Sequence, residues 1–207
     1  IAIFVFHLSV AATVGKGIVQ PDIVDTHVVF GALSGAIVWN LITWYYGIPS
    51  SSSHALIGGI VGAVIAKAGT GSLITFGILK VVAFILISPL LGFIFGSLMM
   101  VIVAWICRRS RPSKVDKWFR RLQLVSAGAY SLGHGGNDAQ KTIGIIWLLL
   151  VATGYLSGDA EAPPMWVIVS CYLMIGFGTM FGGWRIVKTM GQKITKLKPV
   201  GGFCAET

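Results

Sequence analysis

The chain has 207 residues, of which 55% are hydrophobic and 11% are charged, whereas about a quarter are charged in ordinary globular proteins. This composition excludes a soluble globular domain, which could not cover so much apolar surface, and a disordered chain, which needs low hydrophobicity. The net charge of +9 does not indicate a nucleic-acid partner, because the basic residues gather in two short stretches between apolar runs. We therefore predict an all-α, polytopic membrane protein in which the basic stretches set the orientation.

Apolar stretches in the first half of the chain predict membrane helices. Residues 1–14 are part of a span, and because the chain begins inside it without Met, we expect a fragment that is truncated at both ends. Residues 27–47 and 73–107 are each long enough to cross a bilayer, whereas residues 55–68 form a shorter helix. If residues 15–26 lie outside and Arg108 lies inside, the chain between them crosses the membrane an odd number of times. Residues 73–107 cross once, so we expect residues 27–68 to form a hairpin that turns at residues 49–54.

The second half begins with a basic stretch at residues 108–121, which holds seven Lys or Arg residues and one Asp. Its apolar residues recur at helical spacing, which predicts a helix either on the membrane surface or packed on the helix bundle. Apolar residues 122–156, an acidic loop at 157–164, a span at 165–184 and a basic stretch at 185–198 follow. The positive-inside rule places both basic stretches in the cytoplasm and the acidic loop outside.

The first polar interruption has the sequence PSSSSH at residues 49–54. Irregular backbone at membrane depth is tolerated only inside protein or beside a water-filled cavity, so this segment is a candidate site. Pro and Ser favour a helix start, whose free N–H groups bind anions. We predict that four hydroxyl groups contact an oxyanion substrate, those of Ser50, Ser51, Ser52 and Ser53. The alternative is a plain helix cap, and we expect His54 to act mainly as a structural donor.

The second polar interruption has the sequence GHGGNDAQK at residues 133–141. Its three glycines disfavour a regular helix, so we expect a second break. Asp138 would be costly at membrane depth unless it were paired or bound a cation. We predict a cation or proton site at Asp138, with substrate contact from Asn137; the alternative is a structural Asp138–Lys141 pair. Two neighbouring polar side chains, His134 and Gln140, would modulate this site.

Together, GIPSSSSHALIGG (residues 47–59) and SLGHGGNDAQKTIGII (residues 131–146) resemble the inorganic phosphate transporter (PiT) family. The resemblance covers essentially the whole chain in layout. It implies an inverted-repeat secondary transporter with discontinuous helices. Residues 1–107 would then be the C-terminal part of the first repeat, residues 108–121 a basic cytoplasmic linker, and residues 122–207 the N-terminal part of the second repeat.

The resemblance also implies a function: symport of inorganic phosphate with a cation across the plasma membrane, which is the inner membrane in a bacterium. It implies no enzyme activity, no cofactor and no bound metal, with phosphate, H+ or Na+ and membrane lipid as partners. Phosphate would be held by the four serines and Asn137, and the coupling cation by Asp138.

Lys141 departs from the sodium-coupled members, which usually carry small or amide residues after the Asn-Asp pair. We therefore favour proton coupling, with neutral metal–phosphate as one form of the transported species. The alternatives are Na+-coupled phosphate symport and a transporter or channel for another oxyanion such as sulfate. The same layout is compatible with a homo-oligomer.

Overall fold

The structure, a computed structural model, describes residues 17–157, 162–194 and 198–207. This part of the chain is built from helices and contains no β-strand. The span predicted at residues 1–14 lies outside the described residues, as do the acidic Asp159 and Glu161 and the basic Lys196.

Helices α3 (Thr26–Tyr46) and α4 (Ser52–Ala68) form the predicted hairpin. Gly47 ends α3 in the left-handed conformation, with φ of 67°, which favours glycine. The helices cross closely, because a Cβ on Gly59 would clash with the carbonyl oxygen of Ala32. Small residues permit such approach of two backbones in a membrane protein.

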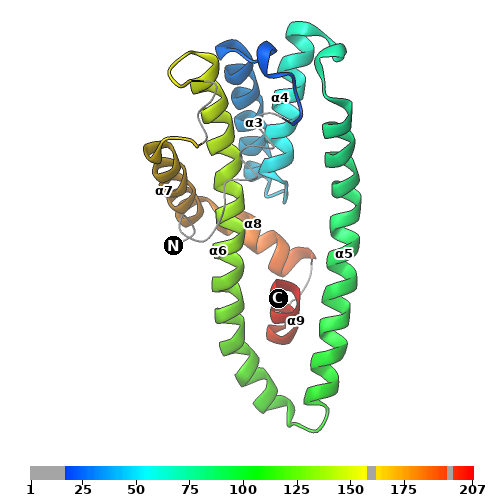
Figure 1. Cartoon of the computed structure of the whole chain (residues 1–207). Helices are drawn as coiled ribbons and strands as arrows, with labels where there is room; N and C mark the ends of the chain where they lie inside the picture. The colour runs from blue at the N-terminus through cyan, green and yellow to red at the C-terminus, as the bar shows by residue number, and fades with distance from the viewer. Residues whose placement is uncertain (1–16, 158–161, 195–197) are drawn as a thin grey trace.

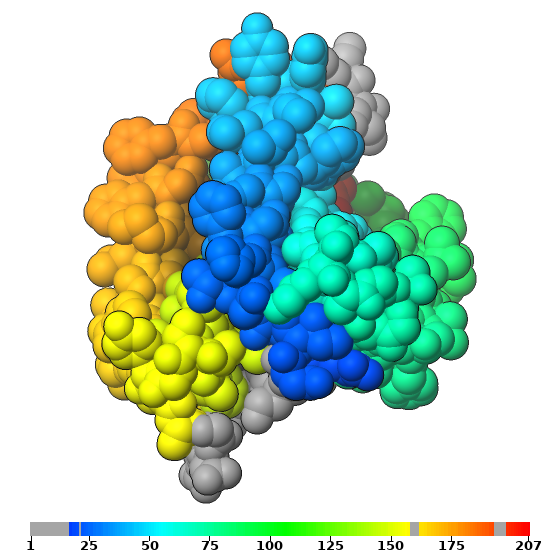
Figure 2. All heavy atoms as spheres, turned by 90° about the horizontal axis from the view of Figure 1, so that it is seen from above, coloured from blue at the N-terminus to red at the C-terminus, as the bar shows by residue number. Residues whose placement is uncertain are grey.

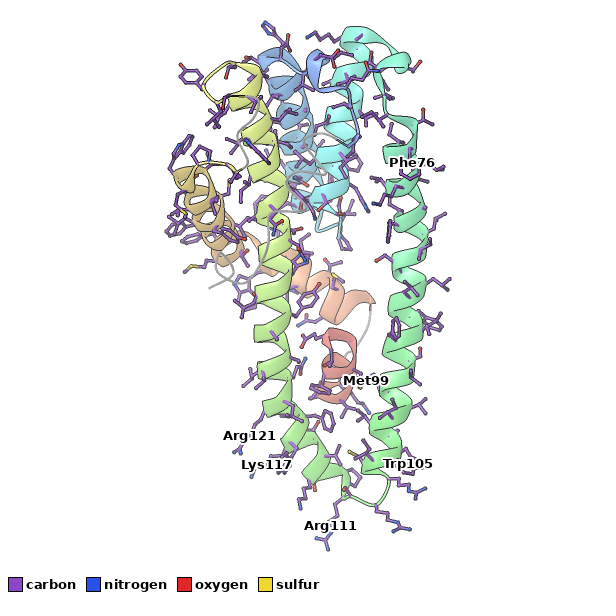
Figure 3. All side chains as sticks on the ribbon, in the orientation of Figure 1. Phe76, Met99, Trp105, Arg111, Lys117 and Arg121 are labelled. Carbon is purple, nitrogen blue, oxygen red and sulfur yellow. The ribbon has the colours of Figure 1, made fainter. Side chains whose placement is uncertain are left out.

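Helices α5 (Thr75–Cys107) and α6 (Pro112–Ala152) are the two longest and are joined by a tight turn at residues 108–111 (Figure 1). Helix α5 confirms the apolar run predicted there. The basic stretch is helical from Pro112 onward and packs on the bundle, since Phe119 is buried and meets the ring of Phe203 at 5.2 Å. Figure 3 shows the side chains of Arg111, Lys117 and Arg121 pointing outward near the tip of this helix pair.

The break predicted at residues 133–141 is wrong, because α6 runs through this segment without interruption. Contacts on two faces of α6 stabilise the helix in this segment. His134 and Lys141 both pair with Asp138 at helical spacing, which stabilises a helix. Ala139 and Ile143 are fully buried against the next helix, α7. These contacts offset the cost of a helical glycine, about 1 kcal/mol relative to alanine.

The remaining helices are α7 (Met165–Gly182), which confirms the predicted last span, α8 (Trp184–Lys188), the π-helical turn η3 (Thr189–Ile194) and α9 (Pro199–Glu206). Two 3-10 turns, η1 (Pro21–Ile23) and η2 (Thr70–Ser72), lie at the other end of the hairpin. Helix α9 packs between α5 and α6, with Cys204 in a core beside Val103 and Phe119.

Among the residues that the structure describes, three helices are long and apolar enough to cross a membrane: α3, α5 and α7. Viewed from above in Figure 2, α3 and α4 lie between α5 on one side and α6 and α7 on the other. One hydrophobic core joins residues of α3 and α4 to Ile145 of α6. This core places the start of α4 against the middle of α6, where the two polar segments can meet.

Candidate functional site

Asp138 is the centre of a cluster of four polar side chains from α4 and α6. Lys141 Nζ donates a hydrogen bond to Asp138 Oδ1 at 2.6 Å and another to Ser53 Oγ. His134 Nε2 lies 3.2 Å from Asp138 Oδ2, and Ser53 Oγ lies 3.5 Å from Asp138 Oδ1. The structure therefore brings the two predicted polar segments together through Ser53, Asp138 and Lys141.

Helical spacing explains why these α6 side chains face α4. His134, Asp138, Lys141 and Ile145 follow one another at intervals of four, three and four residues, so they share one face of the helix. Ile145 is only 2% exposed and packs in the core with α3 and α4. The same face therefore carries the charged groups toward the hairpin.

The electrostatics of the cluster are dominated by an ion pair. The side chains of Lys141 and Asp138 are 23% and 25% exposed, so both charges are partly removed from solvent. Such a pair is favourable only when further hydrogen bonds satisfy it, and Ser53 and His134 supply polar partners. His134 is more exposed and stacks on Tyr130, with ring centroids 5.4 Å apart. The oxygens of Asp138 and Ser53 suit a small cation, and the Lys141 ammonium stands beside both of them.

The four predicted serines do not all face the same part of the protein. Ser53 faces α6, whereas Ser50 and Ser51 line a groove of about 560 Å³ whose walls come from α3 and α4. Ser51 caps α4 and accepts a hydrogen bond from the backbone N–H of His54 at 3.3 Å. Ser52 is the first residue of α4 and is exposed. The serine segment therefore caps α4, as the helix-cap alternative predicted, and it also presents hydroxyl groups to the groove.

Trp39 lines this site, although sequence reasoning did not select it. It lines the groove from α3, and its Nε1 donates a hydrogen bond to Ser50 Oγ at 3.2 Å. A tryptophan inside an apolar span carries no polar signature, so only the fold of the hairpin reveals it. His54 also lines the groove.

The other predicted residues lie apart from the Asp138 cluster. Asn137 is exposed, on a different face of α6 from Asp138, and no described contact joins it to the serines of α4. Gln140 is fully buried within α6. Asn137 is not among the residues that line the groove with Ser50 and Ser51, so their shared contact with the substrate stays a prediction.

A second ion pair closes the opposite end of the hairpin. Lys67 Nζ of α4 lies 2.8 Å from Asp25 Oδ2 and donates to the carbonyl oxygen of Ile23 at 2.8 Å. Asp25 also caps α3 by accepting a hydrogen bond from Val28 N–H at 2.9 Å. The Lys67 hydrogen bond, with that of Val28, lowers the pKa of Asp25 to about 2.

The chain matches the family described as "Phosphate transporter family" over residues 2–207. It is 56% identical to a probable low-affinity inorganic phosphate transporter of Rhizobium meliloti (strain 1021), over 100% of this chain and 62% of the relative. It is 47% identical to a protein of the same description from Bacillus subtilis (strain 168), over 95% of this chain and 60% of the relative. The chain thus spans about three-fifths of the length of these two relatives.

A solved structure described as "The sodium-dependent phosphate transporter" has a similar fold. Its TM-score is 0.81 at 20% sequence identity, over 95% of this chain and 67% of that chain. At this identity the likeness concerns the fold, and it agrees with the predicted all-α transporter architecture.

Proposed function

Because the chain belongs to the phosphate transporter family, we propose that it transports inorganic phosphate across the membrane together with a cation. The family consists of transporters and the chain is not an enzyme. One observation carries the proposal: Ser53 at the start of α4 meets the Lys141–Asp138 pair of α6. In this proposal, the anion-binding start of α4 and the cation-binding carboxylate of Asp138 lie side by side, an arrangement that can couple the binding of the two ions.

Phosphate binds, in this proposal, at the start of α4. The first N–H groups of a helix carry partial positive charge and bind oxyanions. Ser50 and Ser51 add hydroxyl groups on the groove side, and Ser52 and Ser53 stand in the first turn. The Lys141 ammonium can donate to a phosphate oxygen from the α6 side. Asn137 would contribute an amide donor in a conformation that turns its face of α6 toward the groove.

Asp138 is the proposed coupling residue, and we favour a proton as the coupling ion. A bound Na+ would need oxygen ligands such as those of Asp138 and Ser53, and the ammonium of Lys141 already contacts both. A proton needs no such coordination space. The sodium-dependent description of the structural relative keeps Na+ as the alternative. Neutral metal–phosphate remains a proposed form of the transported species.

Uptake of radiolabelled phosphate by the complete protein in proteoliposomes tests the substrate. We expect saturable accumulation that an excess of sulfate does not inhibit, and a strong loss in the Ser53→Ala variant. Equal competition by sulfate would indicate a transporter for oxyanions in general. Equilibration without accumulation against a gradient would indicate a channel.

Substitution of Lys141 tests the choice of ion. In Lys141→Ala, the ammonium is gone and the oxygens of Asp138 and Ser53 are free to accept another cation. We expect the variant to lose proton-driven uptake and to bind Na+, measured as a sodium-dependent rise in thermal stability. Unchanged proton-driven uptake in Lys141→Ala would contradict this part of the proposal.

A further inference from the structure

Arg185 of α8 holds the end of α3 from which the serine segment emerges. Its Nη1 donates a hydrogen bond to the carbonyl oxygen of Tyr45 at 3.1 Å. Its guanidinium lies 4.9 Å from the centroid of the Trp44 ring and 5.7 Å from that of Tyr45. Trp44 Nε1 in turn donates to the carbonyl oxygen of Gly182 at 2.9 Å. These four contacts therefore bind the end of α3 to the junction of α7 and α8.

The physical chemistry of this contact suits arginine. The last carbonyl groups of a helix have no partner within the helix, and the helix dipole favours a cation there. A guanidinium can stack on an aromatic ring and donate a directed hydrogen bond at the same time, which an ammonium does less well. Arg185 meets both conditions at the end of α3.

The held segment leads directly into the groove. Gly47 ends α3. A Cβ added at Gly47 would lie 3.1 Å from Thr189 Oγ1. Thr189 Oγ1 in turn donates a hydrogen bond to the carbonyl oxygen of Arg185 at 3.1 Å. Three residues after Gly47, Ser50 is fixed to Trp39 of the same helix. A shift of the end of α3 would therefore displace the segment that carries Ser50 and Ser51, which line the groove.

Resting on the proposed transport of phosphate, we propose that Arg185 is a positioning residue for the phosphate-binding serines. It acts through Trp44 and Tyr45 and does not touch the substrate. Its loss leaves the serines present but less well placed, so phosphate affinity falls while the coupling cluster around Asp138 is intact. Arg185 also joins the first half of the chain to the second through these contacts.

The test compares phosphate uptake kinetics of the complete protein in proteoliposomes for Arg185→Ala, Arg185→Lys and Trp44→Phe. We expect Arg185→Ala to raise the phosphate KM about tenfold with kcat within about twofold. Arg185→Lys should restore little, since lysine cannot make the stacked, directed contact. Trp44→Phe keeps a ring but loses the bond to Gly182, and should give a smaller rise in KM. Arg120→Ala is the matched control, because Arg120 pairs with Asp116 in the first turns of α6, whereas α3, α4 and the segment between them line the groove.

A wild-type KM in Arg185→Ala would overturn the inference, as would complete rescue by lysine or an equal change in the Arg120→Ala control. If Arg185→Ala does not fold, Trp44→Phe decides, and a wild-type KM in that variant would count against the inference. If the wild-type protein transports no phosphate, the proposed function itself fails, and that result is distinct from an active wild type with an unaffected variant.

Discussion

Asp138 carries a carboxylate in the middle of a long helix, and three side chains compensate it. The Lys141 ammonium neutralises the charge at 2.6 Å, while His134 and Ser53 supply polar partners. Removing one member of a buried pair leaves the other charge uncompensated, which costs more than the pair itself contributes. We therefore expect the state of this pair to determine whether the site can take up a cation.

Asp138→Asn should abolish accumulation of phosphate against a gradient. The amide cannot take up a coupling proton, and Lys141 loses its counter-charge. We expect the concentration ratio reached in proteoliposomes to fall to about one, whereas Asp116→Asn, at the remote pair with Arg120, should accumulate phosphate normally. Wild-type accumulation by purified, folded Asp138→Asn would remove Asp138 from the mechanism.

The crossing of α3 and α4 depends on one glycine. A methyl group at Gly59 would meet the backbone of Ala32, which cannot yield as a flexible side chain would. We expect Gly59→Ala to destabilise the protein by about 1–3 kcal/mol, as overpacking does, and to lower the midpoint of thermal unfolding in detergent.

Gly62 provides the matched control on the same helix, because a methyl group there would meet nothing within 4 Å. Gly62→Ala should be neutral or stabilising by up to about 1 kcal/mol, since alanine has the higher helix propensity. Equal unfolding midpoints for Gly59→Ala and Gly62→Ala would show that the hairpin does not cross as closely as described.

The Asp25–Lys67 pair gives the hairpin a pH dependence with a defined sign. The pKa of Asp25 is lowered from 3.8 to about 2 in the folded chain. A lowered carboxyl pKa stabilises the fold at pH values above the unfolded pKa, and this contribution is lost as pH falls from about 4 toward 2.

Asn at position 25 still caps a helix but cannot form the ion pair. We therefore expect wild type to exceed Asp25→Asn in thermal stability at pH 5 and the difference to shrink toward pH 2.5. A difference that stays constant over this range, measured at fixed ionic strength, would mean that the carboxylate charge does not contribute.

Much of the architecture could be predicted from hydropathy, because long apolar runs have few alternatives in a membrane. Helices α3, α5 and α7 confirm the runs predicted for them, and the hairpin at the PSSSSH segment confirms the turn. The division into inverted repeats at residues 108–121 and the orientation of the basic stretches stay predictions.

Two features depended on tertiary contacts that the sequence does not show. The glycines at 133, 135 and 136 suggested a break, but burial of Ala139 and Ile143 against α7 keeps α6 helical. Residues Ser53 and Lys141 are distant in sequence and meet only because the hairpin packs on α6.

At the scale of the whole molecule, we propose that phosphate movement is coupled to a cation at the Ser53–Lys141–Asp138 cluster. The most direct measurement is uptake of radiolabelled phosphate into proteoliposomes that hold the complete protein, under a proton gradient and a sodium gradient applied separately. We expect the proton gradient alone to drive accumulation. Accumulation driven only by sodium would overturn the proposed coupling ion, and no accumulation under either gradient, by protein shown to be folded and inserted, would contradict the central claim.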